Sequence, residues 1–261
     1  MIDVYTWPTP NGHKVHIMLE ETGLPYRVHG INIREGEQFR PEFLKISPNN
    51  RIPAIVDNDG PNGKPLSLFE SGAILLYLAS KTGKLLPADL HARWACTQWL
   101  MWQMGGLGPM MGQANHFRRY AKDKIQYAID RYSNEANRLT RVLDTRLGEA
   151  RYTAGSEYSI ADIACFPWMR GAEQRGVNLE DYPNVKRWFD AISARPARSP
   201  AARRCGATHR RTCGEPSSSR IPSAMRPGGP SRCSSRTTSA SCWCSSRSRR
   251  QARHSALARA V

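Results

Sequence analysis

The sequence predicts an α/β domain built on a small mixed sheet, followed by an all-α domain and a tail of different composition. Short apolar runs alternate with amphipathic helical patterns up to residue 83, and the pattern after residue 91 is helical. Residues 197–261 contain few aliphatic side chains. We place the first domain at 1–83, a linker at 84–91 and the second domain at 92–196.

The first domain is expected to follow the order strand, helix, strand, helix, strand, strand, helix. Alternating or short apolar runs predict strands at 2–7, 26–33, 52–57 and 66–69. Helical spacing predicts helices at 11–22, 41–46 and from 71 to near 83. Gly23 and Gly83 are the expected stop signals, because glycine adopts the left-handed conformation that ends many helices.

The second domain begins with a Trp-rich helix that runs into Gly105–Pro109, where Pro109 should kink or break it. Further helices are expected at 122–147, 159–174 and 183–194. Ser159 is the expected N-cap of the second of these, with Asp162 as its reciprocal partner in a capping box.

Charge is concentrated in the C-terminal segment. Of the 38 Lys and Arg residues, 14 lie in 197–261, together with one of the 22 acidic residues, so this segment carries +13 of the formal net charge of +16. A chain rich in Arg, Ser, Pro and Gly cannot bury enough apolar surface to offset its ordering entropy, and we expect a disordered tail. We hypothesise that it is a frameshift product of GC-rich coding sequence.

Residues 1–196 carry only +3 of the net charge, so a nucleic-acid partner would depend on the tail alone, and none is expected. No apolar run approaches the ~20 residues that cross a bilayer, which argues against a membrane protein. Cys96 and Cys165 are the cysteines of this part and form no disulfide framework. We therefore expect a cytoplasmic protein without a metal site.

Several separate motifs of residues 1–197 resemble the glutathione transferases, and more narrowly their nu class. They are TPNGHK (9–14), GEQFRPEFLKISPNN (36–50), RIPAIVD (51–57), LFESGAILLYLA (68–79), QWLMWQMGGLGPM (98–110) and YSIADIA (158–164). The resemblance implies a thioredoxin-like first domain, glutathione or its disulfide as cofactor, and a homodimer in which the first domain of one subunit meets the helices of the other.

Glu70 and Ser71 stand at a predicted helix start, where the helix dipole and free amides favour an anion. The Ser71 amide and hydroxyl can hold the γ-glutamyl carboxylate of glutathione, and the Glu70 carboxylate can bind an amine or fix the turn. A plain N-cap is the alternative, and the resemblance favours binding.

Four further positions are implied by the resemblance. A cis Ile52–Pro53 bond would let the Ile52 backbone pair with the cysteinyl residue of glutathione, whereas the residues alone favour a trans proline at a strand edge. Gln38 and Asn50 are polar contacts or ordinary loop residues. Arg131 reaches across the domain interface to a glutathione carboxylate or is a surface Arg paired weakly with Glu135.

The turn before the first helix decides the chemistry. Thioredoxins and glutaredoxins carry Cys-x-x-Cys there, whereas this chain has Thr9-Pro10-Asn11-Gly12. The reactive sulfur should therefore come from glutathione, stabilised as a thiolate by amide donors and the helix terminus. The resemblance places Asn11 and Thr9 beside the sulfurs: Asn11 would orient and polarise the thiol and Thr9 would donate a hydrogen bond. Turn formation is their alternative role.

These residues predict a glutathione-dependent reductase of small-molecule or peptide disulfides. Conjugation of glutathione to small electrophiles would use the same activated thiolate. A non-catalytic glutathione-binding module is the alternative of another class, because a fold does not fix a function.

Overall fold

The computed structural model describes residues 1–196, so the predictions for the tail at 197–261 lie outside the described residues. A four-stranded sheet has the order β2-β1-β3-β4. Its strands are β1 (Ile2–Thr6), β2 (Tyr26–Gly30), β3 (Ala54–Asp57) and β4 (Leu66–Phe69). β1 pairs in parallel with β2 and antiparallel with β3, which pairs antiparallel with β4. The sheet is therefore mixed, as predicted.

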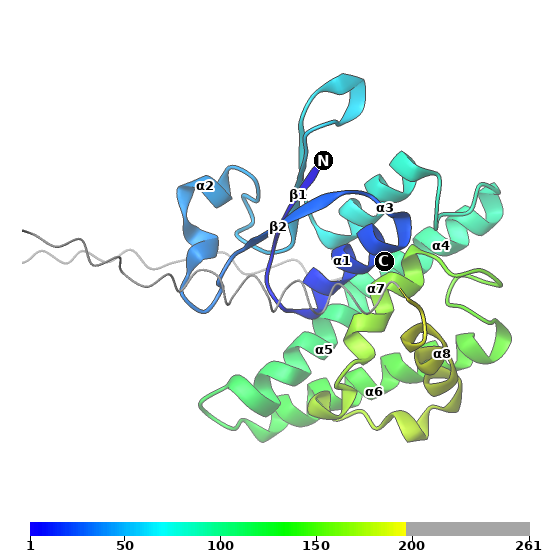
Figure 1. The fold of residues 1–261 in the computed structure, drawn as a ribbon. Helices are drawn as coiled ribbons and strands as arrows, with labels where there is room; N and C mark the ends of the chain where they lie inside the picture. The colour runs from blue at the N-terminus through cyan, green and yellow to red at the C-terminus, as the bar shows by residue number, and fades with distance from the viewer. Residues whose placement is uncertain (197–261) are drawn as a thin grey trace, which may run out of the picture. The chain divides into compact units, whose positions relative to one another are not determined.

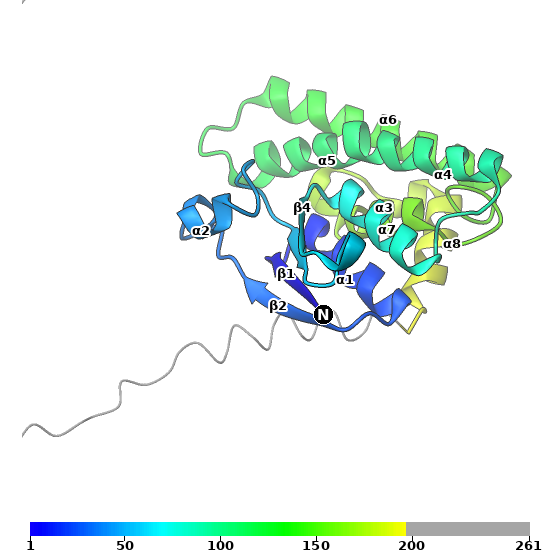
Figure 2. The ribbon, with the colours of Figure 1, turned by 90° about the horizontal axis from the view of Figure 1, so that it is seen from above.

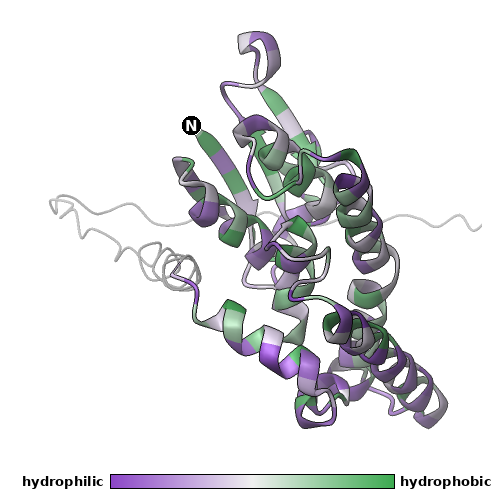
Figure 3. Cartoon of the chain, turned by 90° about the vertical axis from the view of Figure 1, so that its right-hand side faces the viewer, coloured by the Kyte–Doolittle hydropathy of each residue, from purple (hydrophilic) through white to green (hydrophobic). Residues whose placement is uncertain are grey.

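Helices cover both sides of this sheet. Figures 1 and 2 show α1 (Pro10–Thr22) and α3 (Ser71–Thr82) on one side of the strands and the short α2 (Pro41–Leu44) on the other. Figure 3 shows alternating green and purple bands on the strand beside the N label. In β1 the buried Ile2 and Val4 alternate with the half-buried Asp3. Gly23 and Gly83 end α1 and α3 with left-handed φ of 75° and 66°.

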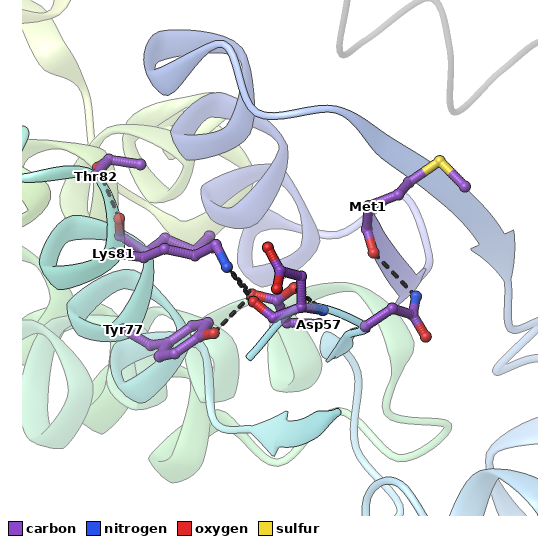
Figure 4. A network of polar contacts seen from close by, with 8 residues as sticks. Met1, Asp57, Tyr77, Lys81 and Thr82 are labelled. Atoms are coloured by element: carbon purple, nitrogen blue, oxygen red, sulfur yellow. Dashed lines mark hydrogen bonds and ion pairs between the residues drawn. The ribbon is translucent and has the colours of Figure 1, made fainter. Parts of the chain in front are cut away.

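A buried polar network fastens α3 to the end of β3 (Figure 4). The Asp57 carboxylate, 1% exposed, accepts a hydrogen bond from Tyr77 Oη at 2.6 Å and pairs with Lys81 Nζ at 2.9 Å. Burial alone would raise the Asp57 pKa, but the hydrogen bonds from Tyr77 and Lys81 outweigh it and lower the pKa. The network holds the C-terminal half of α3 against the sheet.

The rest of the described chain is helical. Its helices are α4 (Leu90–Trp102), α5 (Gly108–Asn115), α6 (Gln126–Glu149), α7 (Ile160–Met169) and α8 (Pro183–Ser193). The fold class predicted from the sequence is confirmed. The domain limits at 83 and 92 stay a prediction.

Of the kink or break expected at Pro109, the break is not found. A π-helical turn, η3 (Gln103–Leu107), joins α4 to α5, and Leu107 and Gly108 keep right-handed helical torsions. Proline is tolerated in the first turn of a helix because the amide it lacks would have no partner there. The wider π turn therefore allows the helical path to continue through Pro109.

α7 begins as predicted and ends earlier than predicted. Ser159 and Asp162 form the capping box, but the helix stops at Met169 instead of Gln174. Arg170 is extended and Gly171 has a left-handed φ of 67°, which turns the chain into a separate 3₁₀ turn. All of Ile160–Met169 is buried, and α7 packs against α1, α3, α4, α5 and α8. Within residues 1–196, no helix has the length and apolarity needed to cross a bilayer.

Candidate functional site

The predicted binding segments meet at one end of the sheet. Tyr5 pairs with Ala54, and Ala54 pairs with Phe69, so the end of β1, the start of β3 and the end of β4 lie side by side. Trp7–Asn11 follow β1, Ile52–Pro53 precede β3 and Glu70–Ser71 follow β4. The pairing thus brings together residues that are 60 positions apart in sequence.

Thr9 is the N-cap of α1, and its Oγ1 accepts a hydrogen bond from the Gly12 amide at 3.2 Å. Gly12 is required because this turn lies close to the strand: a Cβ there would be 2.5 Å from both Thr6 Oγ1 and the Trp7 carbonyl oxygen. The helix start is therefore pressed onto the end of β1, with its first amides at the edge of the sheet.

The Asn11 side chain is oriented by a residue of the helical part. Trp168 Nε1 donates a hydrogen bond to Asn11 Oδ1 at 3.2 Å. Because an indole N–H can only donate, the amide oxygen must face Trp168, which leaves the Asn11 NH₂ group to donate elsewhere. The sequence did not single out Trp168, since a tryptophan on a fully apolar helix is indistinguishable from a core residue.

The helix α5 and an arginine lie against the Trp168 ring. A Cβ on Gly108 or on Gly112 would lie 3.5 Å from the ring, an ordinary van der Waals distance, so α5 is directly beside the ring at both positions. Arg175 lies 5.4 Å from the ring centroid and donates from Nη1 to the Trp168 carbonyl oxygen at 3.0 Å. With 9% of its surface exposed, Trp168 has little freedom to turn away from Asn11.

The Ile52–Pro53 peptide bond is cis, as the resemblance implied. Pro53 is buried and Ile52 is half-buried. The strand β3 begins at Ala54, so the prediction that Ile52 belongs to this strand is wrong. Among the described residues, no backbone–backbone hydrogen bond uses the amide or carbonyl of Ile52. Both groups are therefore available to an extended ligand.

Ser71 is the first residue of α3, and Glu70 is its N-cap. Glu70 has a left-handed φ of 70°, which is costly for a side chain with a Cβ and makes this residue a candidate for a functional role. Its exposed carboxylate accepts a hydrogen bond from Asn49 Nδ2 at 3.3 Å. Ser71 is buried, and its Oγ donates to Met104 Sδ at 3.6 Å.

A buried lysine lies beneath Ser71. Lys14 is 1% exposed, and its Nζ donates to Gln103 Oε1 at 2.7 Å and to Ser71 Oγ at 3.4 Å. Burial lowers the Lys14 pKa to about 7, with the charges of Cys165 and Glu70 acting in the opposite direction. Lys14 enters the sequence analysis only within the TPNGHK motif, without a predicted role. The sequence signal that could have indicated this role is a lysine on the apolar face of a predicted helix.

Gln38 and Asn50 lie in the segment between β2 and β3. Gln38 is 9% exposed, its Nε2 donates to the Ile33 carbonyl oxygen, and its Oε1 has no partner among the described residues. Asn50 is half-buried with a left-handed φ of 47°. A buried acceptor without a partner is costly, so Gln38 is suited to receive a donor from a ligand.

Arg131 lines an open pocket of about 900 Å³ formed by α6 and Met110 of α5, together with Tyr127 and Asn134 of the same helix face. Glu135 accepts two hydrogen bonds of 2.8 Å from Arg138, and the charge of Arg131 makes a further, smaller contribution to lowering the Glu135 pKa. The weak Arg131–Glu135 interaction given as the alternative therefore exists in the structure.

No thiol of the described chain is available at the site. Cys96 and Cys165 are free, both are 0% exposed, and burial raises the pKa of each thiol. Their burial makes both of them core thiols. No group of three or more His, Cys, Asp or Glu side chains in residues 1–196 could hold a metal ion.

Comparisons with known proteins agree with the predicted family. Residues 1–80 match the glutathione S-transferase N-terminal domain and residues 104–196 the C-terminal domain. The disulfide-bond oxidoreductase YfcG of Escherichia coli is 54% identical over 198 residues, covering 76% of this chain and 92% of YfcG. The E. coli disulfide-bond oxidoreductase YghU is 42% identical, covering 75% of this chain and 72% of YghU.

Solved structures give the same result. A glutathione transferase of Burkholderia graminis, with two glutathione molecules bound per subunit, is 49% identical with a TM-score of 0.73, covering 77% of this chain and 86% of that one. One of Pseudomonas putida, with one glutathione disulfide bound per subunit, is 46% identical with a TM-score of 0.74, covering 77% and 90%. The family predicted from the motifs is confirmed: this chain belongs to the glutathione transferase family.

Proposed function

We propose that this protein is a glutathione-dependent disulfide-bond reductase in which bound glutathione supplies the reactive thiolate. The observation that carries the proposal is the start of α1, which presents Thr9 and an oriented Asn11 amide where related redox folds place cysteines. Cys96 and Cys165 are fully buried and cannot take over that role. The similar E. coli proteins YfcG and YghU carry the name disulfide-bond oxidoreductase.

Glutathione would lie along the end of the sheet. We assign the γ-glutamyl carboxylate to Ser71 at the start of α3, with Glu70 at the amine. The free amide and carbonyl of Ile52 would pair with the cysteinyl residue, and Gln38 and Asn50 would add polar contacts. This order brings the sulfur to the NH₂ group of Asn11 and to Thr9 at the start of α1.

The reaction then proceeds by two thiol–disulfide exchanges. The thiolate of the first glutathione attacks a substrate disulfide, forming a mixed disulfide and releasing one substrate sulfur as a thiolate. A second glutathione thiolate attacks the glutathione sulfur of the mixed disulfide, giving glutathione disulfide and the second substrate thiolate. Protons lost by the two glutathione thiols reappear on the substrate thiols. Asn11 would stabilise the attacking sulfur anion.

Arg131, which lines the open pocket of α5 and α6, is proposed to reach across the domain interface to a glutathione carboxylate. A homodimer is proposed as well. The expected dimer places the first domain of one subunit against the helices of the other. We propose a cytoplasmic location, which is in keeping with two free, buried cysteines in the described chain.

Turnover of bis(2-hydroxyethyl) disulfide with reduced glutathione tests the function. We expect protein-dependent formation of glutathione disulfide that exceeds any conjugation of 1-chloro-2,4-dinitrobenzene. Conjugation without disulfide reduction would instead make the protein a conjugating transferase. Glutathione binding without either activity would make it a binding module.

A further inference from the structure

Lys14 is a buried amine that lacks an anionic partner among residues 1–196. In the part of the chain that the structure describes, none of the salt bridges includes Lys14. The neighbours of its Nζ are neutral: Gln103 Oε1 at 2.7 Å, Ser71 Oγ at 3.4 Å and Met104 Sδ at 3.8 Å. Buried charges in proteins are normally paired, so the protonated form of Lys14 would be stabilised by an anion that these neighbours do not supply.

The titratable groups that face Lys14 cannot fully supply that charge. From the start of α3 comes Glu70, whose exposed carboxylate is turned to Asn49. From α7 comes the Cys165 thiol, which stays protonated at neutral pH because burial raises its pKa. The turn η3 contributes Gln103 and Met104, neither of which titrates. Without a further anion, burial lowers the Lys14 pKa to about 7, so the amine is partly neutral under ordinary conditions.

Resting on the proposed function, we infer that Lys14 is the buried counter-ion of the glutathione carboxylate at Ser71, and that binding of this carboxylate draws a proton onto Lys14. The contacts give the route. Lys14 donates to Ser71 Oγ, while the Ser71 hydroxyl hydrogen points to a thioether, a weak acceptor. A carboxylate can take that hydrogen bond from Met104 and place its negative charge one hydroxyl group away from the lysine.

The turn η3 fixes Lys14 in this position without neutralising it. Gln103 is 0% exposed, and Gly108 leaves room for its side chain, since a Cβ there would lie 2.6 Å from Gln103 Nε2. A glutamate at 103 would have supplied an internal counter-ion at the same distance. The glutamine keeps the charge of Lys14 available to a ligand. Lys14 is thus a positioning residue, acting on the ligand through Ser71.

Titration calorimetry of the full chain with S-methylglutathione tests the inference, because the blocked thiol cannot release a proton. Measurements at pH 6, 7 and 8 in two buffers of different ionisation enthalpy give the protons taken up. We expect uptake of about half a proton per site at pH 7 and a Kd about tenfold weaker at pH 8 than at pH 6.

Three variants distinguish the inferred counter-ion role of Lys14 from a purely structural role. Lys14→Met removes the charge and Gln103→Glu supplies an internal carboxylate; in both, proton uptake should vanish and Kd should become independent of pH. Gln103→Glu retains the lysine and carries the test if Lys14→Met does not fold. Lys64→Met, which removes an exposed lysine of the same domain, is the matched control and should keep the uptake.

The outcomes distinguish the inference from the proposed function. Binding of S-methylglutathione without proton uptake, or uptake that persists in Gln103→Glu and in folded Lys14→Met, would overturn the role of Lys14 and leave the reductase intact. No binding by the unaltered protein would defeat the glutathione site itself, and the inference with it.

Discussion

Both α7 and α1 begin with a hydroxyl residue at the N-cap, Ser159 and Thr9, but their first turns are completed in different ways. At α7, Asp162 accepts hydrogen bonds from the amides of Thr153 and Ser159 and from Trp188 Nε1, all between 2.8 and 3.0 Å. At α1, Thr9 caps a single amide, and Asn11 is held by Trp168 with its NH₂ group directed elsewhere. The polar groups at the start of α7 are therefore satisfied by other residues of the protein, whereas the start of α1 keeps a donor available to a ligand.

This difference separates structural from functional helix starts. A capping residue indicates where a helix begins in either case. A structural helix start differs from a functional one in whether the donors, acceptors and charges around its first turn have partners. At α1 the Asn11 NH₂ group is oriented but unused, and one turn later the buried Lys14 has no anionic partner among the described residues. Substitutions at α7 should therefore change stability, and substitutions at α1 should change activity.

The largest effect is expected for Asp162→Ala. The change leaves buried donors of Thr153, Ser159 and Trp188 without an acceptor, so the free energy of unfolding should fall by about 3 kcal/mol or more. Urea denaturation followed by far-UV circular dichroism measures it. A loss below about 1 kcal/mol would mean that the cap of α7 is not the structural anchor described above.

The next largest effect is expected for Asn11→Ala, and it should fall on activity. Loss of a hydrogen bond to a thiolate predicts a decrease of about 10- to 100-fold in kcat/KM for disulfide reduction. The free energy of unfolding should change by less than about 1 kcal/mol, because Asn11 is only half-buried. Unchanged turnover would remove Asn11 from the catalytic group.

A smaller effect is expected for Trp168→Phe, which keeps an aromatic ring and removes the N–H that orients Asn11. We expect kcat/KM to fall about 3- to 10-fold. The double variant Asn11→Ala/Trp168→Phe should be no worse than Asn11→Ala alone, because both changes act through one amide. Trp102→Phe, a half-buried tryptophan of α4, is the matched control. Additive losses would show that Trp168 acts independently of Asn11.

The smallest effect concerns Asp57 at the other end of β3. Its carboxylate, like that of Asp162, is satisfied by other residues of the protein. Its pKa is lowered in the folded state, so the carboxylate stabilises the fold above its unfolded pKa of about 3.9, and this contribution is lost as pH falls through the folded pKa. Asp57→Asn should flatten the loss of stability between pH 5 and pH 3 by about 1 kcal/mol. Parallel curves for the two proteins would contradict the lowered pKa.

Local signals predicted most of the fold. Strand alternation, the glycine stops at 23 and 83, and the capping box at Ser159 all depend on neighbours in sequence, and each is found in the structure. The signal at Pro109 misled because proline breaks a helix interior but not its first turn, and a π turn places it there. Whether a proline is at the interior or the start of a helix depends on packing that a single segment does not show.

Residues of the candidate site could be predicted only where they belong to a family motif. Family resemblance pointed to Asn11, the cis Ile52–Pro53 bond and Ser71. Trp168 and Gln103 lie 157 and 89 residues from the α1 side chains that they contact, so no local pattern connects them. Such contacts depend on how α7 and η3 pack against α1, and they are visible only in three dimensions.

The central claim is that glutathione, and not the protein, supplies the reacting sulfur. The most direct test replaces all seven cysteines of the full chain, with alanine at 96 and 165 and serine at 205, 213, 233, 242 and 244. We predict that the cysteine-free protein reduces bis(2-hydroxyethyl) disulfide with reduced glutathione at a kcat/KM within about twofold of the parent, since a change of 0.4 kcal/mol is about twofold. Loss of turnover in a folded variant that still binds glutathione would contradict the claim, because a protein thiol would then be carrying the electrons.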